Sequence, residues 1–500
     1  MGVKSIVAKT IASFVATSIY KDQKKALNIQ HKLLKSFLHQ AAQTDFGKEH
    51  RFDEIKSYED YRQSLKICDY ESLKNYIELI ADGKKDVLWK GLPLYFCKSS
   101  GTTSGTKYIP VTSNQISAMI TAARNALMMY ISETGHADFF DHKMIFLQGS
   151  PELEKYGKIP TGRLSGIAYN HVPTWLHANR MPSYTTNCIS DWEEKIEAIA
   201  KETLMERMSL ISGIPPWVVM YFEKLRELSG KEFIKDIFPD FRLFAHGGVN
   251  YEPYRNRIET LIGEAIPTVE TYPASEGFIA FQDSQTAPGL LLNVNGGIFY
   301  EFIKAEEIFR DQPQRIALDE VELDVNYAII LTTNAGLWAY ELGDTIKFTS
   351  INPYRIIVTG RVKHFISAFG EHVIGEEVEQ ALLFAMRTFH VGVTEFTVAP
   401  NVSPTGEQPF HEWFIEFSKP PIQLQEFAKM MDKFLQEKNP YYFDLRKGNV
   451  VQQLKVRPLL PNAFANYMKS QGKLGGQNKV PRLINDRKIA DQLEEWVLKE

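Results

Sequence analysis

The sequence has 500 residues, a formal net charge of −4 and 44% hydrophobic residues. This length exceeds the size at which a single hydrophobic core stops growing, so two or three domains are expected. The composition is that of a globular protein and excludes fibrous, disordered and disulfide-rich classes. The charge balance offers no basic surface for nucleic acid, and no contiguous run of lysine and arginine indicates a membrane surface. We therefore expect small-molecule partners, with no nucleic acid and no membrane.

The three cysteines are odd in number and far apart, which indicates neither a disulfide framework nor a zinc site. The N-terminal segment is the one candidate targeting signal, but Lys9, Thr10 and Ser13 interrupt the apolar run that a signal peptide needs. Its apolar residues recur at helical spacing, and a run of about 18 apolar residues, enough to span a bilayer, occurs nowhere in the sequence. We expect an amphipathic N-terminal helix in a cytoplasmic protein, and a monomer.

Taken in chain order, apolar spacing and turn residues predict an α/β fold with two domains. Helices are expected up to about residue 90, followed by a strand, a hydroxyl-rich loop, a second strand and a capped helix over 113–135. Helices dominate 164–238, and short strands alternate with glycine-rich turns over 242–348. Beyond residue 360 a helix and two alternating strands indicate a compact α+β unit. The expected architecture is a large N-terminal domain at 1–359, with mixed sheets flanked by helices and a barrel-like subdomain, joined by a hinge to a small C-terminal domain at 360–500.

The loop SSGTTSGTKYIPVT concentrates hydroxyl side chains and glycines around one lysine. Glycine permits backbone conformations in which consecutive N–H groups converge on an anion, while hydroxyls add donors and lysine adds a point charge. A Walker A loop is excluded, because Thr106 replaces its last glycine and Tyr108 follows the lysine. The loop suits a polyphosphate, and a hydroxyl-rich surface turn is the alternative. The candidate phosphate-binding residues are Ser99, Ser100, Gly101, Thr102, Thr103 and Lys107.

Two later turns carry carboxylates that suit the same ligand. TYPASEG places Tyr272, Ser275 and Glu276 between two predicted strands, and the carboxylate of Glu276 is a candidate ligand for the Mg²⁺ that phosphate chemistry requires. YELGD ends a strand in a turn that presents Asp344, a carboxylate able to accept two ribose hydroxyls. Taken alone, the first is a weak signal and the second is equally an ordinary Gly-Asp turn.

The order of these segments resembles that of the adenylate-forming superfamily of acyl-CoA synthetases, luciferases and peptide-synthetase adenylation domains. Its hinge motif is similar to GRVKHFISAFGEHVIGEEVE, which on its own also fits a plain interdomain hinge. The resemblance implies that Arg361 contacts ribose or phosphate and that the small domain rotates about Lys363. It also implies an adenine-binding turn in HGGVNYEP, with candidate residues Gly247, Gly248 and Val249.

Segments throughout the chain resemble the auxin-responsive GH-three family more closely, in particular its bacterial members. AAQTDFGKEHRF, CKSSGTTSGTKYIPVT, ISGIPPWVVMYFEKL and QNKVPR carry this resemblance. Plant members are acyl acid amido synthetases, which join a carboxylic acid to an amino acid using ATP. The resemblance implies ATP and Mg²⁺, activation of a small carboxylic acid to an acyl adenylate with release of pyrophosphate, and transfer to an amine, with an amino acid as the expected acceptor. Glu276 and Lys479 are the expected catalytic residues, and Lys479 is alternatively a solvated loop lysine.

A hydrophobic segment is the candidate acyl pocket. In ISGIPPWVVMYF, residues Trp217, Val218 and Tyr221 lie at helical spacing, and packing in the core is the alternative for each. The identity of the acid is not transferred from the family, because a few side chains of the pocket decide it. Two other functions stay open: an acyl-CoA ligase, which shares the adenylation step, and a nucleotide-binding protein without catalysis.

Overall fold

The N-terminal region of the computed structural model is helical, as the amphipathic spacing predicts. Polar caps begin two of the helices: Ser57 and Asp69 each accept from the third residue of the helix and are bonded back in turn. The helices are α1 (Val3–Gln23), α2 (Ala26–Ala41), α3 (Asp45–Glu49), α4 (Tyr58–Ser64) and α5 (Tyr70–Ala81). The structure describes residues 3–102, 105–172, 174–248, 251–305, 307–308, 310, 312–362, 365–366, 368–371, 373–471, 480 and 482–498.

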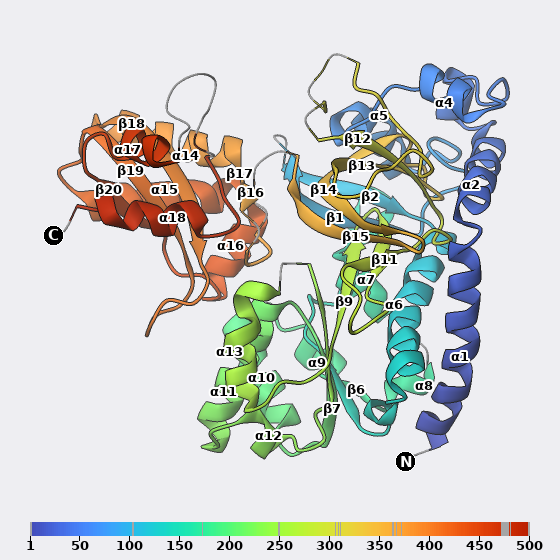
Figure 1. The fold of residues 1–500 in the computed structure, drawn as a ribbon, viewed down its shortest axis with the longest axis horizontal. Helices are drawn as coiled ribbons and strands as arrows, with labels where there is room; N and C mark the ends of the chain where they lie inside the picture. Colours follow the sequence, from blue (N-terminus) through green and yellow to red (C-terminus); the bar gives the residue numbers. More distant parts are fainter. Residues whose placement is uncertain are drawn as a thin grey trace.

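A large mixed sheet forms the centre of the N-terminal region (Figure 1). It has 11 strands in the order β12-β13-β14-β15-β11-β10-β9-β8-β7-β3-β6. The strands from β9 to β6 are parallel, and those from β10 to β12 are antiparallel and include the strands expected in a barrel-like subdomain. The bounds are β3 (Lys143–Phe146), β6 (Arg180–Met181), β7 (Met208–Ser212), β8 (Leu243–Gly247), β9 (Thr268–Ala274), β10 (Gly277–Phe281), β11 (Leu290–Leu292), β12 (Ile298–Lys304), β13 (Asn326–Thr333), β14 (Tyr340–Ile351) and β15 (Tyr354–Arg361).

A second sheet and eight helices complete this region. The four-stranded sheet has the order β2-β1-β5-β4, with β1 (Tyr95–Thr102), β2 (Gly105–Val111), β4 (Glu154–Tyr156) and β5 (Ile159–Gly162). β7 interrupts the segment predicted as helical, because its run of five residues, MSLIS, is too short for its apolar spacing to distinguish strand from helix. The helices are α6 (Ser113–Thr134), α7 (Leu164–Tyr169), α8 (Thr174–His177), α9 (Tyr184–Asn187), α10 (Trp192–Thr203), α11 (Pro215–Ser229), α12 (Ile234–Ile237) and α13 (Glu252–Ile262).

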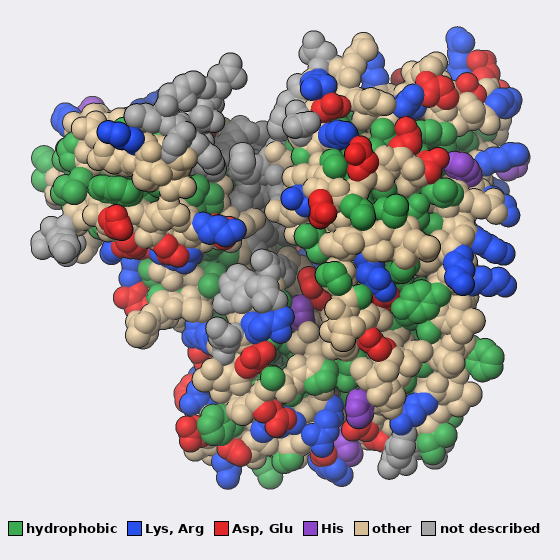
Figure 2. Space-filling view, viewed as in Figure 1, with side chains coloured by type: hydrophobic (Ala, Val, Ile, Leu, Met, Phe, Trp, Pro, Cys, Tyr) green, Lys and Arg blue, Asp and Glu red, His purple; other side chains and the backbone are tan. Residues whose placement is uncertain are grey.

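The residues after β15 form a separate lobe with its own three-stranded sheet, β18-β19-β20 (Figure 1). Charged side chains of both signs cover the visible face of both lobes (Figure 2). β15 ends at Arg361, so the domain boundary predicted between residues 359 and 360 lies two residues before the end of this strand. The elements are β16 (Phe365–Ile366), β17 (Val373–Ile374), α14 (Gly375–Phe389), β18 (Gly392–Asn401), β19 (Phe410–Lys419), α15 (Leu424–Lys438), α16 (Pro440–Lys447), β20 (Lys455–Leu459), α17 (Ala463–Ser470) and α18 (Lys488–Leu493).

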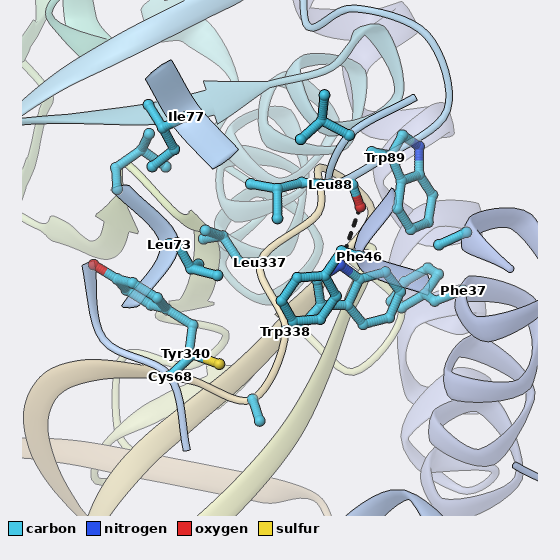
Figure 3. Close-up of a cluster of buried hydrophobic side chains, with 14 of the residues drawn as sticks. Phe37, Phe46, Cys68, Leu73, Ile77, Leu88, Trp89, Leu337, Trp338 and Tyr340 are labelled. Carbon is cyan, nitrogen blue, oxygen red and sulfur yellow. Dashed lines mark hydrogen bonds between the residues drawn. The ribbon is translucent and has the colours of Figure 1, made fainter. Parts of the chain in front are cut away.

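An aromatic cluster fixes the first residues of β14 (Figure 3). Trp338 is completely buried, and its indole N–H donates to the carbonyl of Leu88 at 3.0 Å. Its ring lies 4.6 Å from that of Phe52. Tyr340 borders the same cluster, with its hydroxyl directed away from Trp338 (Figure 3). Packing at this end of β14 therefore determines where the rest of the strand lies.

Thr112 caps α6, the long helix beside β9 and β10. Its Oγ1 accepts from the N–H of Gln115 at 3.2 Å and donates to the carbonyl of Asn334 at 3.0 Å. Thr112→Ala removes both bonds and is expected to lower the free energy of unfolding by about 1–2 kcal/mol, measured from the urea midpoint. Thr388→Ala removes only one hydrogen bond at an exposed helix position, to the carbonyl of Phe384. It should change the free energy of unfolding by less than about 0.5 kcal/mol. Equal midpoints for the two variants would contradict the prediction.

Candidate active site

The hydroxyl-rich segment forms the tip of a β-hairpin. Ser99 pairs with Lys107 and Thr102 with Gly105, and the register shifts between these two pairs. The sequence predicted a loop here because Ser, Gly and Thr are turn residues, but pairing with β2 extends the strand. A register shift of this kind bends a strand and re-aims its side chains. The structure places the backbone of Ser100, Gly101 and Thr102 in β1, and Thr103 lies outside the described residues.

Lys107 connects the hairpin to β14. Its Nζ donates to the hydroxyl of Tyr340 at 3.3 Å and lies 5.8 Å from the centre of that ring. It also lies 6.0 Å from the ring of Tyr70, so aromatic faces surround the ammonium group. Burial, and next the charge of Glu276, raises the pKa of Tyr340 well above its ordinary value. The phenol therefore stays protonated and offers its oxygen to Lys107.

Side chains from two other elements hold the turn between β9 and β10. The Sγ–H of Cys97 in β1 donates to Oγ of Ser275 at 3.2 Å. Gln115 in α6 donates from its side-chain amide to the backbone carbonyl of Glu276 at 2.6 Å. Glu276 is only 6% exposed. The turn that presents this carboxylate is thus fixed by the hairpin on one side and by α6 on the other.

Asp344 lies in β14 and is also 6% exposed. The prediction that YELGD ends a strand in a turn is wrong: this segment begins β14, because it pairs with β13 and β15 and the strand continues to Ile351. The hydroxyl of Tyr272 in β9 donates to its Oδ2 at 2.5 Å. Across the ladder, Asp344 pairs with Arg361, for which the structure gives the backbone only. The preceding Gly343 has φ +87°, and no described atom lies within 4 Å of the place where its side chain would stand. The nearly buried carboxylate accepts from Tyr272, and each carboxylate oxygen can accept more than one hydrogen bond, so the group is suited to ligand hydroxyls as well.

The carboxyl end of β8 lies beside the same turn. Gly247 pairs with Thr271, and a Cβ at Gly247 would lie 2.2 Å from the Thr271 carbonyl oxygen, so only glycine fits. Gly248 has φ +81°, and the nearest described atom to its missing side chain belongs to Ile214, 3.8 Å away. Val249 lies outside the described residues. The carboxyl ends of parallel strands are where ligands bind in open α/β sheets.

The C-terminal lobe contacts this edge through two tyrosine hydroxyls. Tyr441 in α16 donates to the carbonyl of Lys98 at 3.1 Å, next to the hairpin tip, and burial raises its pKa to about 12. Tyr254 in α13 donates to the carbonyl of Ala368. Sequence reasoning identified neither residue, and no motif marks them. Lys363 and Lys479, the two lysines expected from this lobe, lie outside the described residues.

One network of contacts therefore includes four of the predicted nucleotide-binding residues, Lys107, Tyr272, Ser275 and Asp344. Lys107 contacts β14 through Tyr340, and Asp344 of the same strand binds Tyr272. Glu276 follows Ser275 in the turn, and its charge raises the pKa values of Tyr340, Cys97 and Tyr441 after the larger effect of burial. Tyr340 stands first in the YELGD motif, and its position there is the signal that could have identified it. Within the described ranges, no group of three or more His, Cys, Asp or Glu side chains is placed to hold a metal.

The predicted acyl-pocket residues are placed differently. Val218 and Tyr221 are completely buried in the core beneath α11, where the Tyr221 hydroxyl shares a 2.6 Å hydrogen bond with Thr203. Core packing, the alternative stated from the sequence, describes both side chains. Trp217 is half-buried, with its ring 4.5 Å from that of Trp192. A cavity of 390 Å³ lies beside α11 but is lined by other residues, among them Val219, Met220, Arg257 and Val450. The acyl-pocket assignment stays a prediction.

Two of the three cysteines are expected to resist alkylation in the folded protein. Burial raises the pKa of Cys97 to about 12 and that of Cys68 to about 11, whereas Cys188 is partly exposed. A raised thiol pKa leaves less thiolate at every pH below it, by roughly 10²- to 10³-fold at pH 8 for these shifts. Iodoacetamide at about pH 8 should therefore modify Cys188 first, measured by peptide mass spectrometry. Equal rates in native protein would contradict this, and urea should equalise them.

Comparison with known proteins tests the family. The N-terminal domain model of the GH3 family matches residues 15–188 and 161–267, its central domain model matches 291–361, and its C-terminal domain model matches 376–488. The chain belongs to the GH3 family. The predicted family resemblance is thereby confirmed, and the three GH3 models together reach from the first amphipathic helix to α18.

Individual relatives of this GH3 protein are consistent with the family assignment. Jasmonoyl-L-amino acid synthetase JAR4 of Nicotiana attenuata is 21% identical over 544 residues, covering 93% of this chain and 92% of its own. Indole-3-acetic acid-amido synthetase GH3.10 of Arabidopsis thaliana is 26% identical over 206 residues, 39% of this chain and 34% of its own. The solved structure of AtGH3.15 acyl acid amido synthetase with 2,4-DB has a TM-score of 0.62 at 16% identity, covering 97% and 96% of the two chains. That of 2-hydroxyisobutyryl-CoA ligase with 2-HIB-AMP and CoA has 0.58 at 14%, covering 94% and 92%. These two likenesses confirm the predicted α/β fold.

Proposed function

We propose that the protein is an ATP-dependent acyl acid amido synthetase, which activates a small carboxylic acid as an acyl adenylate and transfers the acyl group to the amine of an amino acid. The observation that carries the proposal is the network joining Lys107, Glu276 and Asp344 in a GH3 chain. The relatives named for amido synthetase activity support acid and amino acid as the two substrate classes.

The donors and acceptors of the network fit an adenosine phosphate. Asp344 would accept hydrogen bonds from the ribose hydroxyls, and Arg361 lies opposite it in the β14–β15 ladder. Lys107 and the backbone and hydroxyl groups of the hairpin tip would hold the phosphates. The turn after Gly247 would receive the adenine, because it follows the carboxyl end of the parallel strand β8, where ligands bind in open α/β sheets.

Glu276 fits the role of the Mg²⁺ ligand. Its carboxylate is nearly buried, and sites that bind Mg²⁺ together with phosphates commonly use only one or two protein carboxylates. When bound, the metal would offset negative charge on the phosphate oxygens. The network thus supplies separate groups for the ribose, the phosphates and the metal.

The two-step route avoids a reaction that fails in water. A carboxylate and an amine form a salt at neutral pH, and oxide is a poor leaving group. In the first step a carboxylate oxygen attacks the α-phosphorus of ATP, and the bond from that phosphorus to pyrophosphate breaks. In the second, the amine nitrogen attacks the acyl carbonyl, the bond to AMP breaks, and the nitrogen loses a proton. Lys107 and the hairpin donors would stabilise the phosphate charge that develops in the first step.

The remaining roles rest on the family resemblance. Lys479 would reach the α-phosphate and the carboxylate as charge develops, and the C-terminal domain, residues 360–500, would rotate about Lys363 between the two steps. Thr103 and Val249 would add contacts to phosphate and adenine. We also infer a cytoplasmic location, a monomer and no nucleic-acid partner.

The test is acid-dependent exchange of labelled pyrophosphate into ATP, measured across a panel of carboxylic acids. Exchange with one or more acids is expected, and its absence across a broad panel would leave nucleotide binding without catalysis. For an active acid, product is then followed by mass spectrometry with amino acids and with CoA in parallel. An amide supports the proposal, whereas a thioester formed only with CoA would make the protein an acyl-CoA ligase.

A further inference from the structure

Helix α1 turns its small residues inward. The residues that face α6 are at most 8% exposed and lie in a common cluster with that helix. Small side chains let the two helix backbones approach closely at these positions, while Val15 and Ile19, further along α1, are half-buried against the same cluster. These inward residues are Ser5, Ala8, Ala12 and Ala16.

Four large apolar residues near the beginning of α1, in contrast, are exposed on its outer side. Val7, Ile11 and Phe14 are 51%, 45% and 75% exposed, and Ile6 is 56% exposed. The first three recur at the spacing of one helix face, so they form a continuous stripe. Single exposed apolar residues are ordinary in proteins, but four within nine residues of one helix form a patch, which marks an interaction surface.

The first two helices carry a strong excess of lysine. The first 44 residues contain seven lysines and a single acidic residue, although the whole chain has a net charge of −4. Lysine and arginine side chains gather along the right-hand edge of Figure 2, where Figure 1 places α1 and α2. Six of the seven lysines are exposed and Lys9 is half-buried. The seven are Lys4, Lys9, Lys21, Lys24, Lys25, Lys32 and Lys35.

We propose that α1 and the adjoining lysines dock the protein on an anionic lipid surface. The stripe of Val7, Ile11 and Phe14 enters the interface between head groups and acyl chains, and the lysines face the head groups. Apolar insertion and electrostatic attraction are the two contributions that together give stable peripheral binding. A second copy of this chain fits less well, because two equally basic surfaces repel each other.

This inference differs from the sequence prediction of no membrane partner, which stays a prediction until the experiment below is done, and it does not depend on the proposed function. That prediction considered contiguous basic runs, whereas these lysines are spread over two helices that the fold places along one edge. The docking is peripheral, since none of the helices in the described ranges is long and apolar enough to cross a bilayer.

The experiment is sedimentation of the full chain with vesicles of phosphatidylcholine, with and without phosphatidylserine. Binding is expected only to the vesicles with phosphatidylserine, and added salt should weaken it. Ile11→Ser with Phe14→Ser should lower the partition coefficient by on the order of 10²-fold. Met205→Ser with Ile422→Ser, at positions 92% and 101% exposed elsewhere, is the matched control and should bind like the unmodified chain.

A charge pair keeps the test independent of the apolar variants. Lys24→Glu with Lys25→Glu should reduce binding by on the order of tenfold or more, and Lys429→Glu with Lys433→Glu, exposed on α15, should not. Absence of binding to anionic vesicles, or equal binding by all variants, would overturn the proposal. So would a lipid-free dimer that Ile11→Ser with Phe14→Ser converts to a monomer, because the stripe would then be an interface between two copies.

Discussion

Asp344→Ala is expected to weaken ATP binding by on the order of 10³-fold. A carboxylate that accepts from two ribose hydroxyls makes two charge-assisted hydrogen bonds, each contributing about 1.5–3 kcal/mol. Asp344 is only 6% exposed, so little water would replace the lost acceptor. Calorimetric titration with ATP measures the change directly, without requiring an active acid substrate.

Two controls separate the ribose contact from effects on the fold. Tyr272→Phe removes the 2.5 Å hydrogen bond to Asp344 but keeps the carboxylate, so ATP binding should fall less than about tenfold. Asp319→Ala makes the same change at an exposed position and should leave binding unaltered. If Tyr272→Phe weakened binding as much as Asp344→Ala, the carboxylate would act by holding β9 against β14 and not by binding ribose.

The sequence predicted the elements whose own residues determine them. α6 spans Ser113–Thr134 with Gly135 directly after it, as the capped helix predicted over 113–135 requires, and β18 and β19 appear where alternation indicates strands. Elements that depend on a partner were missed. β7 is a short buried segment that becomes a strand because β3 and β8 flank it, and β1 extends to Thr102 because β2 pairs with it.

The candidate site shows the same division. Glu276 was identifiable because it stands in a turn with a glycine beside it, and Asp344 because it follows a glycine in YELGD, although that segment begins β14 and is not a turn. Their linkage through β14, Tyr272 and Tyr340 was not, because it depends on strand register over more than 60 residues. Tyr441 reaches the carbonyl of Lys98 across 343 residues, a contact that no local pattern encodes. Sequence motifs therefore predicted which charged groups belong to the site. Strand pairing in the sheet determines which of these groups lie close together.

Glu276→Gln is expected to lower acid-dependent pyrophosphate exchange by on the order of 10³-fold. Glutamine keeps the shape of the side chain and leaves the backbone carbonyl bonded to Gln115, so the turn should survive. The substitution removes only the negative charge. A hard divalent cation binds a charged carboxylate oxygen more strongly than the neutral amide oxygen that replaces it. Glu276 is 6% exposed, so this charge lies inside the protein and not on its outer surface.

The Mg²⁺ dependence of exchange distinguishes a metal ligand from a structural carboxylate. If Glu276 holds the metal, Glu276→Gln should need a higher Mg²⁺ concentration for half-maximal exchange, and excess Mg²⁺ should recover part of the rate. Glu78→Gln, at an exposed position on α5, should match the unmodified protein at every concentration. A loss of exchange that is the same at all Mg²⁺ concentrations would assign Glu276 to shaping the turn, because a missing ligand must change the metal requirement.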